Sequence, residues 1–128
     1  MNRSADWLDQ AAWDLQAAED SAARGHHEWA AFQAQQCAEK AVKALVESLH
    51  GAVRGHGIAE ILRRLPAGLT VPDAILEAAV ALDRAYIPPR YPNAFPSGKP
   101  RDYFNDKSSR EYMAYARQVL EFCRSQIH

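Results

Sequence analysis

The chain has 128 residues, the size of one domain with a single hydrophobic core, and we expect one domain over residues 1–128. Hydrophobic residues make up 48% of it and charged residues 24%, which excludes a collagen-like, coiled-coil or disordered protein. The formal net charge is -1, so the protein as a whole does not attract nucleic acid or an anionic membrane, and any polyanion must bind a local basic patch.

The chain has the features of a cytoplasmic protein. Its amino terminus carries no apolar signal core, and no run approaches the roughly 18 apolar residues that span a membrane. Cys37 and Cys123 each lie among apolar neighbours at helical spacing, which indicates reduced thiols in the core. We therefore expect a cytoplasmic location and no membrane contact.

The first half of the chain predicts two long helices. One is expected to open at Ser4, a good N-cap, and to close at Gly25. The other is expected from about Glu28 to His50, stopped by Gly51 in the left-handed conformation. This second helix has two apolar faces, which indicates a central helix or one that also meets a second subunit. Its second face is formed by Trp29, Phe32 and Gln36.

The second half predicts a short helix and two longer ones. The short helix starts at Ile58 and ends before Pro66, and Pro72 opens the next helix, which runs until Pro88. The last helix begins between Asn105 and Ser109, with more than one residue able to cap it. No segment alternates with a period of two. The prediction is an all-α, antiparallel up-and-down helical bundle of four main helices plus a short helix, with a proline-rich loop before the last helix.

Few polar groups fit familiar enzyme chemistry. His26 and His27 adjoin a helix junction and point apart, so we expect solvated capping residues. The spacing of His50 and His56 matches no common zinc pattern, and phosphate-loop, dinucleotide and hydrolase motifs are absent from the sequence. We therefore expect neither a metal nor a cofactor. Glu39, Lys43 and Glu47 follow each other four residues apart, which is typical of an exposed, salt-bridged helix face.

The stretch AYIPPRYPNAFPSGKP, residues 85–100, concentrates the unusual chemistry of the chain. It holds five of the seven prolines. Cations and aromatic residues alternate along it and its flanks, a mixture that can hold phosphates while rings stack on bases. A structural interpretation is equally open, in which the aromatic residues fasten a long loop across the bundle. The residues concerned are Arg84, Tyr86, Arg90, Tyr91, Phe95, Lys99, Arg101 and Tyr103.

Several runs together resemble the HEPN family of small helical bundles. They are WL at 7–8 with Ala11, WAAFQAQQCAEKAVKAL at 29–45, GHGI at 55–58 with Leu62 and Leu65, and LD at 82–83 followed by YIPPRYPN at 86–93. The resemblance implies an up-and-down bundle that forms a two-fold homodimer with a cleft between subunits. Many members resemble metal-independent ribonucleases, often toxins paired with a small nucleotidyltransferase antitoxin.

The signature of those ribonucleases is an arginine and a histidine separated by four to six residues. In such a pair the histidine would transfer a proton and the arginine would stabilise the charge that develops on the phosphate. Arg90 stands at the arginine position, but the histidine positions hold Phe95, Pro96 and Ser97. None of the three titrates near neutral pH, so we assign no catalytic residue. His56 could replace the missing group, although the glycines on both sides of it favour a turn.

The sequence therefore predicts a HEPN-like dimer that binds a nucleotide or RNA around Arg90 without ribonuclease activity. Two alternatives stay open: a metal-independent ribonuclease toxin that uses an atypical residue such as His56, and a structural dimer that docks a nucleotidyltransferase partner. The candidate nucleotide- and phosphate-binding residues are Arg90, Tyr91, Asn93, Arg84, Lys99 and His56.

Overall fold

The computed structural model describes residues 2–52, 55, 57–66 and 68–127. As the sequence predicts, the described part is all-α and contains no strand. Its helices are α1 (Ser4–Ala23), α2 (His27–Ser48), α3 (Ile58–Arg63), α4 (Asp73–Asp83) and α5 (Asp106–Gln126), with two short 3₁₀ turns, η1 (Pro92–Ala94) and η2 (Pro100–Asp102), between α4 and α5. His56, one of the candidate site residues, lies outside the described residues.

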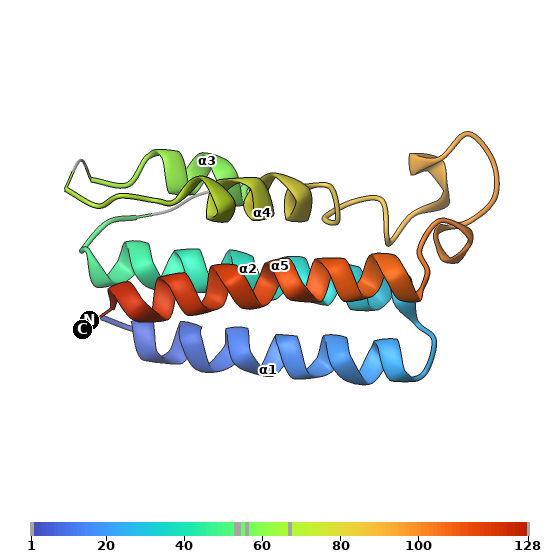
Figure 1. Ribbon diagram of the computed structural model, residues 1–128, viewed down its shortest axis with the longest axis horizontal. Coiled ribbons are helices and arrows are strands. Elements are labelled where there is room, and N and C mark those ends of the chain that lie inside the picture. Colours follow the sequence, from blue (N-terminus) through green and yellow to red (C-terminus); the bar gives the residue numbers. More distant parts are fainter. Residues whose placement is uncertain (1, 53–54, 56, 67, 128) are drawn as a thin grey trace.

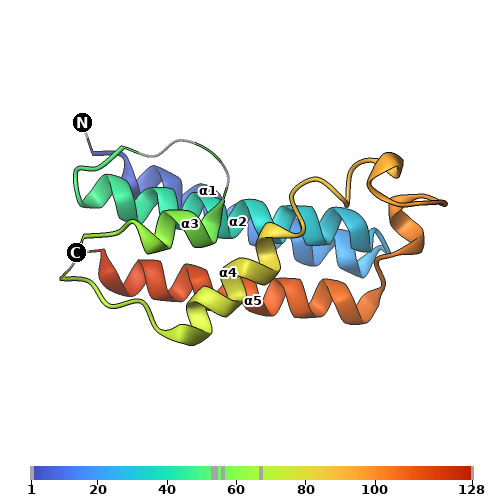
Figure 2. The same ribbon diagram turned by 90° about the horizontal axis from the view of Figure 1, so that it is seen from above.

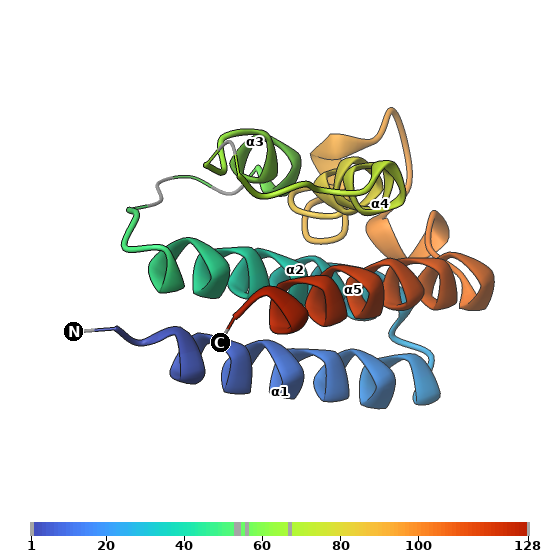
Figure 3. The same cartoon turned by 60° about the vertical axis from the view of Figure 1, so that its left-hand side comes forward.

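The long helices α1, α2 and α5 run side by side, and α3 and α4 cover α2 and α5 on the side away from α1 (Figures 1 and 3). α2 contacts α1, α3, α4 and α5, so it is the central helix that its two apolar faces predict. The segment between α4 and α5 projects at the end of the bundle opposite the two chain termini (Figure 2). This arrangement places the proline-rich loop beside the amino-terminal end of α2.

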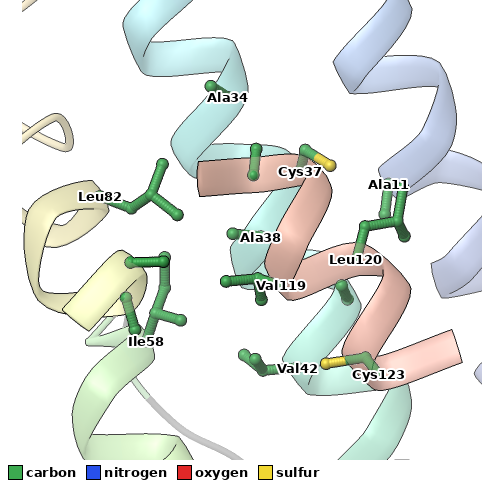
Figure 4. Close-up of a cluster of buried hydrophobic side chains, with 14 of the residues drawn as sticks. Ala11, Ala34, Cys37, Ala38, Val42, Ile58, Leu82, Val119, Leu120 and Cys123 are labelled. Carbon is green, nitrogen blue, oxygen red and sulfur yellow. The ribbon is translucent and has the colours of Figure 1, made fainter. Parts of the chain in front are cut away.

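Small side chains let the helices approach closely at the core. Helix spacing depends on the side chains at the contact, and alanines permit the shortest separation. Cys37 and Cys123 lie in this core with their sulfur atoms well apart (Figure 4), and both are free thiols. Burial raises the pKa of each thiol to about 12, so both stay protonated and unreactive at neutral pH. The fully buried alanines at the helix contacts include Ala11, Ala18, Ala30, Ala34, Ala38, Ala41 and Ala116.

The ends of the first two helices correct two predictions. Ser4 is the first residue of α1 rather than its cap, because the N-cap position is occupied by Arg3. At the end of α2 the left-handed residue is His50, with φ of 61°, and not Gly51. The N–H of His50 donates to Glu47 O, and that of Gly51 donates to the carbonyl five residues back, the hydrogen bonds of a Schellman motif. The chain thus leaves α2 one residue earlier than the glycine indicates.

The amino-terminal end of α5 settles an alternative that the sequence leaves open. Asn105 is the N-cap, and its side chain accepts a hydrogen bond from the N–H of Ser108 at 2.9 Å. The Ser108 hydroxyl in turn accepts from the N–H of Asn105 at 2.8 Å, which completes a capping box. The proline-rich loop therefore ends at the capped first turn of α5.

The described part of the chain lacks membrane-spanning helices and metal-binding clusters. None of the helices there combines the length and the hydropathy that a bilayer-spanning segment needs. No group of three or more histidine, cysteine or acidic side chains within residues 2–52, 55, 57–66 and 68–127 is placed to hold a metal ion.

Candidate functional site

Arg90 lies shortly after the end of α4, in a turn shaped by two prolines. The N–H of Arg90 donates to the carbonyl of Ile87 at 3.1 Å, which closes the turn around Pro88 and Pro89. Pro89 is fully buried, and the fixed φ of proline favours such a turn. The side chain of Arg90 folds back, so that its Nε donates to the carbonyl of Tyr86 at 2.8 Å.

Three aromatic rings surround the guanidinium of Arg90, and we call Phe32, Tyr86 and Tyr91 the aromatic cage. The guanidinium carbon lies 4.4 Å from the ring centre of Phe32, 4.6 Å from that of Tyr86 and 5.3 Å from that of Tyr91. Each such contact is worth about 0.5–2 kcal/mol, depending on exposure. The cage therefore joins α2 to the loop through a cation and fixes the position of that cation.

The terminal nitrogens of this arginine stay available. Arg90 is half-buried, and within the described residues the only hydrogen bond of its side chain is the one from Nε to the carbonyl of Tyr86. The described residues also hold no carboxylate within ion-pair distance of it. An arginine presents five N–H donors in a fixed plane, so the Nη edge of Arg90 can bind an oxyanion without rearranging.

The structure brings only part of the predicted set of residues to Arg90. Tyr91 belongs to the cage, and Asn93 lies in the next turn, η1, with its side chain exposed. Lys99 instead faces its own turn, η2, where its ammonium lies 3.5 Å from the carboxylate of Asp102. Arg84 caps the end of α4 and lines a shallow surface pocket with residues of α3, α4 and α5. The cations that are close in sequence thus belong to different surfaces.

A second aromatic cluster organises the far part of the loop, and we call Phe95, Tyr103 and Phe104 the loop cluster. Phe95 stacks on Tyr103 with ring centres 4.0 Å apart and meets Phe104 edge-on at 6.4 Å. The hydroxyl of Tyr103 also donates to the carbonyl of Ser97 at 2.6 Å. No residue belongs to both the loop cluster and the cage. Phe95, at the signature's histidine position, is therefore held by its own loop and not by Arg90.

The charged row on α2 is more buried than its spacing predicts. Glu39 is only 4% exposed and is not on an open salt-bridged face. It accepts a hydrogen bond from Lys43 Nζ at 3.0 Å and one from Gln35 Nε2 at 3.2 Å. Glu47 accepts the indole N–H of Trp7 at 3.0 Å, so it fastens α1 to α2. The spacing predicts the Glu39–Lys43 ion pair correctly. It cannot show that α1, α3, α4 and α5 all pack against α2.

His27 is a polar contact that the sequence does not reveal. It is half-buried, and its Nδ1 lies 2.9 Å from the hydroxyl oxygen of Ser109, so it is not a solvated cap. Ser109 is completely buried, and its hydroxyl donates to the carbonyl of Asp106 at 3.1 Å. The serine oxygen therefore accepts from Nδ1–H. This pair joins the start of α2 to the start of α5. No sequence pattern predicts the contact, because the two residues lie 82 positions apart and meet only in the folded bundle.

Similar solved structures and a family comparison agree on the relationship of this chain. TT1696 from Thermus thermophilus is 38% identical with a TM-score of 0.97, and the match covers 99% of this chain and 100% of that one. ST0689, an archaeal HEPN homologue, is 37% identical with a TM-score of 0.85 and full coverage of both chains. A HEPN domain protein from Thermotoga maritima, tm0613, is 30% identical with a TM-score of 0.76, covering 94% of this chain and 95% of that one.

No curated protein matches the chain. The HEPN domain model, in contrast, matches residues 4–126, which include every helix of the structure. The resemblance read from the sequence is therefore confirmed, and the chain belongs to the HEPN family.

Proposed function

We propose that this HEPN protein binds a nucleotide or a short stretch of RNA through Arg90 and the aromatic cage, and that it does not cut RNA. The observation that carries the proposal is the guanidinium held on three rings with its Nη nitrogens unpaired among the described residues. A phosphate can accept two parallel hydrogen bonds from such a fork. Arginine needs no proton transfer to bind an anion in this way.

The surface next to Arg90 supports base stacking and a second subunit. Trp29, Ile87 and Tyr91 are each 47% exposed, although large apolar side chains are usually covered. Trp29 also meets Phe32 edge-on at 6.1 Å, which extends the cage along α2. Stacking of one base on an aromatic ring is worth about 1–3 kcal/mol. A homodimer that closes over this surface would give the ligand a cleft between subunits.

The absence of cleavage follows from the residue at the position of the histidine. Phenylalanine has no titratable group, and Phe95 belongs to the loop cluster instead of the cage. A bound phosphodiester would then meet the arginine without a proton-transfer group at position 95. Binding without turnover is the expected result.

The test of binding is a titration of AMP and of a short single-stranded RNA against the purified protein. Arg90→Ala is expected to weaken both by about 10-fold to 100-fold, because a hydrogen bond to a charged group contributes about 1.5–3 kcal/mol. Arg101→Ala is the matched control, since Arg101 is exposed in η2 and outside the cage. Equal affinities for wild type and Arg90→Ala would refute the assignment of the site.

The test of chemistry is RNA cleavage in EDTA. Wild type is expected to leave RNA intact, and Phe95→His is expected to do the same, because an imidazole at position 95 would take the place of the ring stacked on Tyr103. Cleavage by wild type that disappears in Arg90→Ala would establish the ribonuclease alternative. Cleavage gained by Phe95→His would mean that the loop readily brings position 95 to Arg90.

A second candidate function is docking of a protein partner such as a small nucleotidyltransferase, and Trp13 favours it. Its side chain, on α1, is 69% exposed. Exposed tryptophans are enriched among residues that dominate protein interfaces. Trp13→Ala is expected to abolish co-purification with a co-expressed nucleotidyltransferase while nucleotide binding stays normal. Unchanged co-purification would refute a docking role for Trp13.

A further inference from the structure

A glutamine of α2 lies beside the aromatic cage. Gln36 follows Phe32 by four residues, so the two side chains are neighbours on the helix surface. Gln36 is half-buried, whereas the preceding Gln35 is completely buried. The amide of Gln36 is thus one helical turn from the ring that supports Arg90, on the same side of α2.

A row of hydrogen bonds fixes which way the Gln36 amide points. The carboxylate of Glu39 can only accept, so the amide nitrogen of Gln35 must face it, at 3.2 Å. The carbonyl oxygen of Gln35 is then turned toward Gln36 and accepts from its Nε2 at 2.8 Å. Lys43 holds the other carboxylate oxygen of Glu39 at 3.0 Å. The ion pair therefore orients Gln36 through two successive amide groups.

The consequence is an acceptor that the buried row does not use. One N–H of the Gln36 amide donates to Gln35, and the oxygen of the same amide is left over from this contact. Within the described residues this oxygen accepts no hydrogen bond. A base stacked at the cage can satisfy it with an exocyclic amino group, such as the N6 of adenine or the N4 of cytosine. A base with a carbonyl in place of that amino group would offer this oxygen no exocyclic donor.

We infer that Gln36 is a specificity residue that selects amino-bearing bases over their keto counterparts. The inference rests on the proposed binding of a nucleotide at Arg90 and adds the identity of the base. AMP and IMP separate the two questions, because they share ribose, phosphate and purine ring and differ at the position-6 substituent and the protonation of N1. The affinity of the protein for both nucleotides measures binding at Arg90. The ratio of the AMP affinity to the IMP affinity measures the contribution of Gln36.

The experiment measures the dissociation constants of AMP and IMP by calorimetry for wild type and four variants. Wild type is expected to bind AMP about 3-fold to 10-fold more tightly than IMP, the effect of one hydrogen bond. Gln36→Met, which keeps the length of the side chain, is expected to bring the ratio to about one. Gln33→Met is the control on the same helix, because Gln33 accepts from Ser21 and belongs to the α1 contact. It is expected to keep the wild-type ratio.

The other two variants keep the test decisive. Gln36→Glu gives up the N–H that Gln35 accepts but keeps an acceptor at this length, so it is expected to keep the preference for AMP while its charge weakens the binding of both nucleotides. Arg90→Ala is expected to weaken both and leave their ratio unchanged. A wild-type ratio of one, or a preference that survives in Gln36→Met, overturns the role of Gln36 and leaves the Arg90 site standing. Failure of wild type to bind either nucleotide overturns the proposed function and this inference together.

Discussion

Asp83, the last residue of α4, offers a stringent test of how the start of α3 is held against α4. Its carboxylate accepts hydrogen bonds from the N–H groups of Ile58 at 2.8 Å and Ala59 at 3.3 Å, so it caps α3 from another helix. Asp83→Ala leaves both donors without this partner. Loss of an N-cap costs about 0.5–2 kcal/mol, and a partly buried N–H left unpaired costs about 1–3 kcal/mol. We expect Asp83→Ala to lower the free energy of unfolding by about 1–3 kcal/mol.

The pH dependence of this contact has a definite sign. Burial raises the pKa of the Asp83 carboxyl above its ordinary value of 3.8, against the opposing effects of the two N–H groups and Arg63. The folded protein therefore holds this proton more tightly than the unfolded chain. Its contribution to stability is fully present below pH 3.8 and is lost as the pH rises through the raised pKa. Asp83→Asn keeps one acceptor and removes the titration.

The assay is urea unfolding followed by circular dichroism at several pH values between about 3.5 and 7. The stability of wild type minus that of Asp83→Asn is expected to fall with rising pH through this window and then to level off. Glu77→Gln, an exposed change on the same helix, controls for general charge effects. A difference that grows with pH would refute the sign, and an Asp83→Ala variant as stable as wild type would refute the capping role.

Other predictions concern backbone strain and thiol reactivity. His50→Gly is expected to stabilise the protein by about 0.5–1 kcal/mol in thermal unfolding, because φ of 61° suits glycine. Gly98→Ala is expected to lower stability by about 1–2 kcal/mol, since φ is 78° and a Cβ would lie 2.9 Å from Asp102 Oδ2; an unchanged melting temperature would contradict this. Iodoacetamide at pH 8 is expected to leave Cys37 and Cys123 unmodified in native protein and to modify both after unfolding, because burial raises each thiol pKa to about 12.

The number and type of the helices could be predicted because the apolar periodicity agrees with the positions of helix-ending glycines and prolines along most of the sequence. Gly25 ends α1 where the pattern places it, with φ of 82°, and α4 starts directly after Pro72. The expected end of α4 at Pro88 was wrong, because the helix already ends at Asp83 and the chain turns before the two prolines. The predicted end of α2 was wrong, because His50 adopts the left-handed conformation that Gly51 was expected to adopt. A glycine indicates where a chain can turn, but the hydrogen bonds of the last helical turn decide which residue does so.

The site was only partly predictable, because proximity in the chain is a poor guide to proximity in space. Arg84 and Lys99 flank Arg90 in sequence, yet Arg84 lines a surface pocket with residues of α3, α4 and α5, and Lys99 pairs with Asp102. The residue that completes the cage is Phe32, 58 positions before Arg90 and on another helix. The aromatic spacing on α2 predicts a second apolar face, and only the packing of the loop shows that this face meets the arginine.

The pairing of other cations distinguishes the two interpretations of the loop. The partly buried lysines of α2 both have carboxylate partners, Asp14 for Lys40 and Glu39 for Lys43. These pairs meet the usual requirement that a charge removed from water be compensated. Arg90 is also half-buried, but its described surroundings are three rings and one carbonyl. Rings attract a guanidinium without consuming its donors, so this cation is positioned while none of the described carboxylates compensates its charge. If Arg90 served only to hold the loop on the bundle, a carboxylate beside it would add stability. If it binds phosphate, a carboxylate there would compete with the phosphate for the guanidinium.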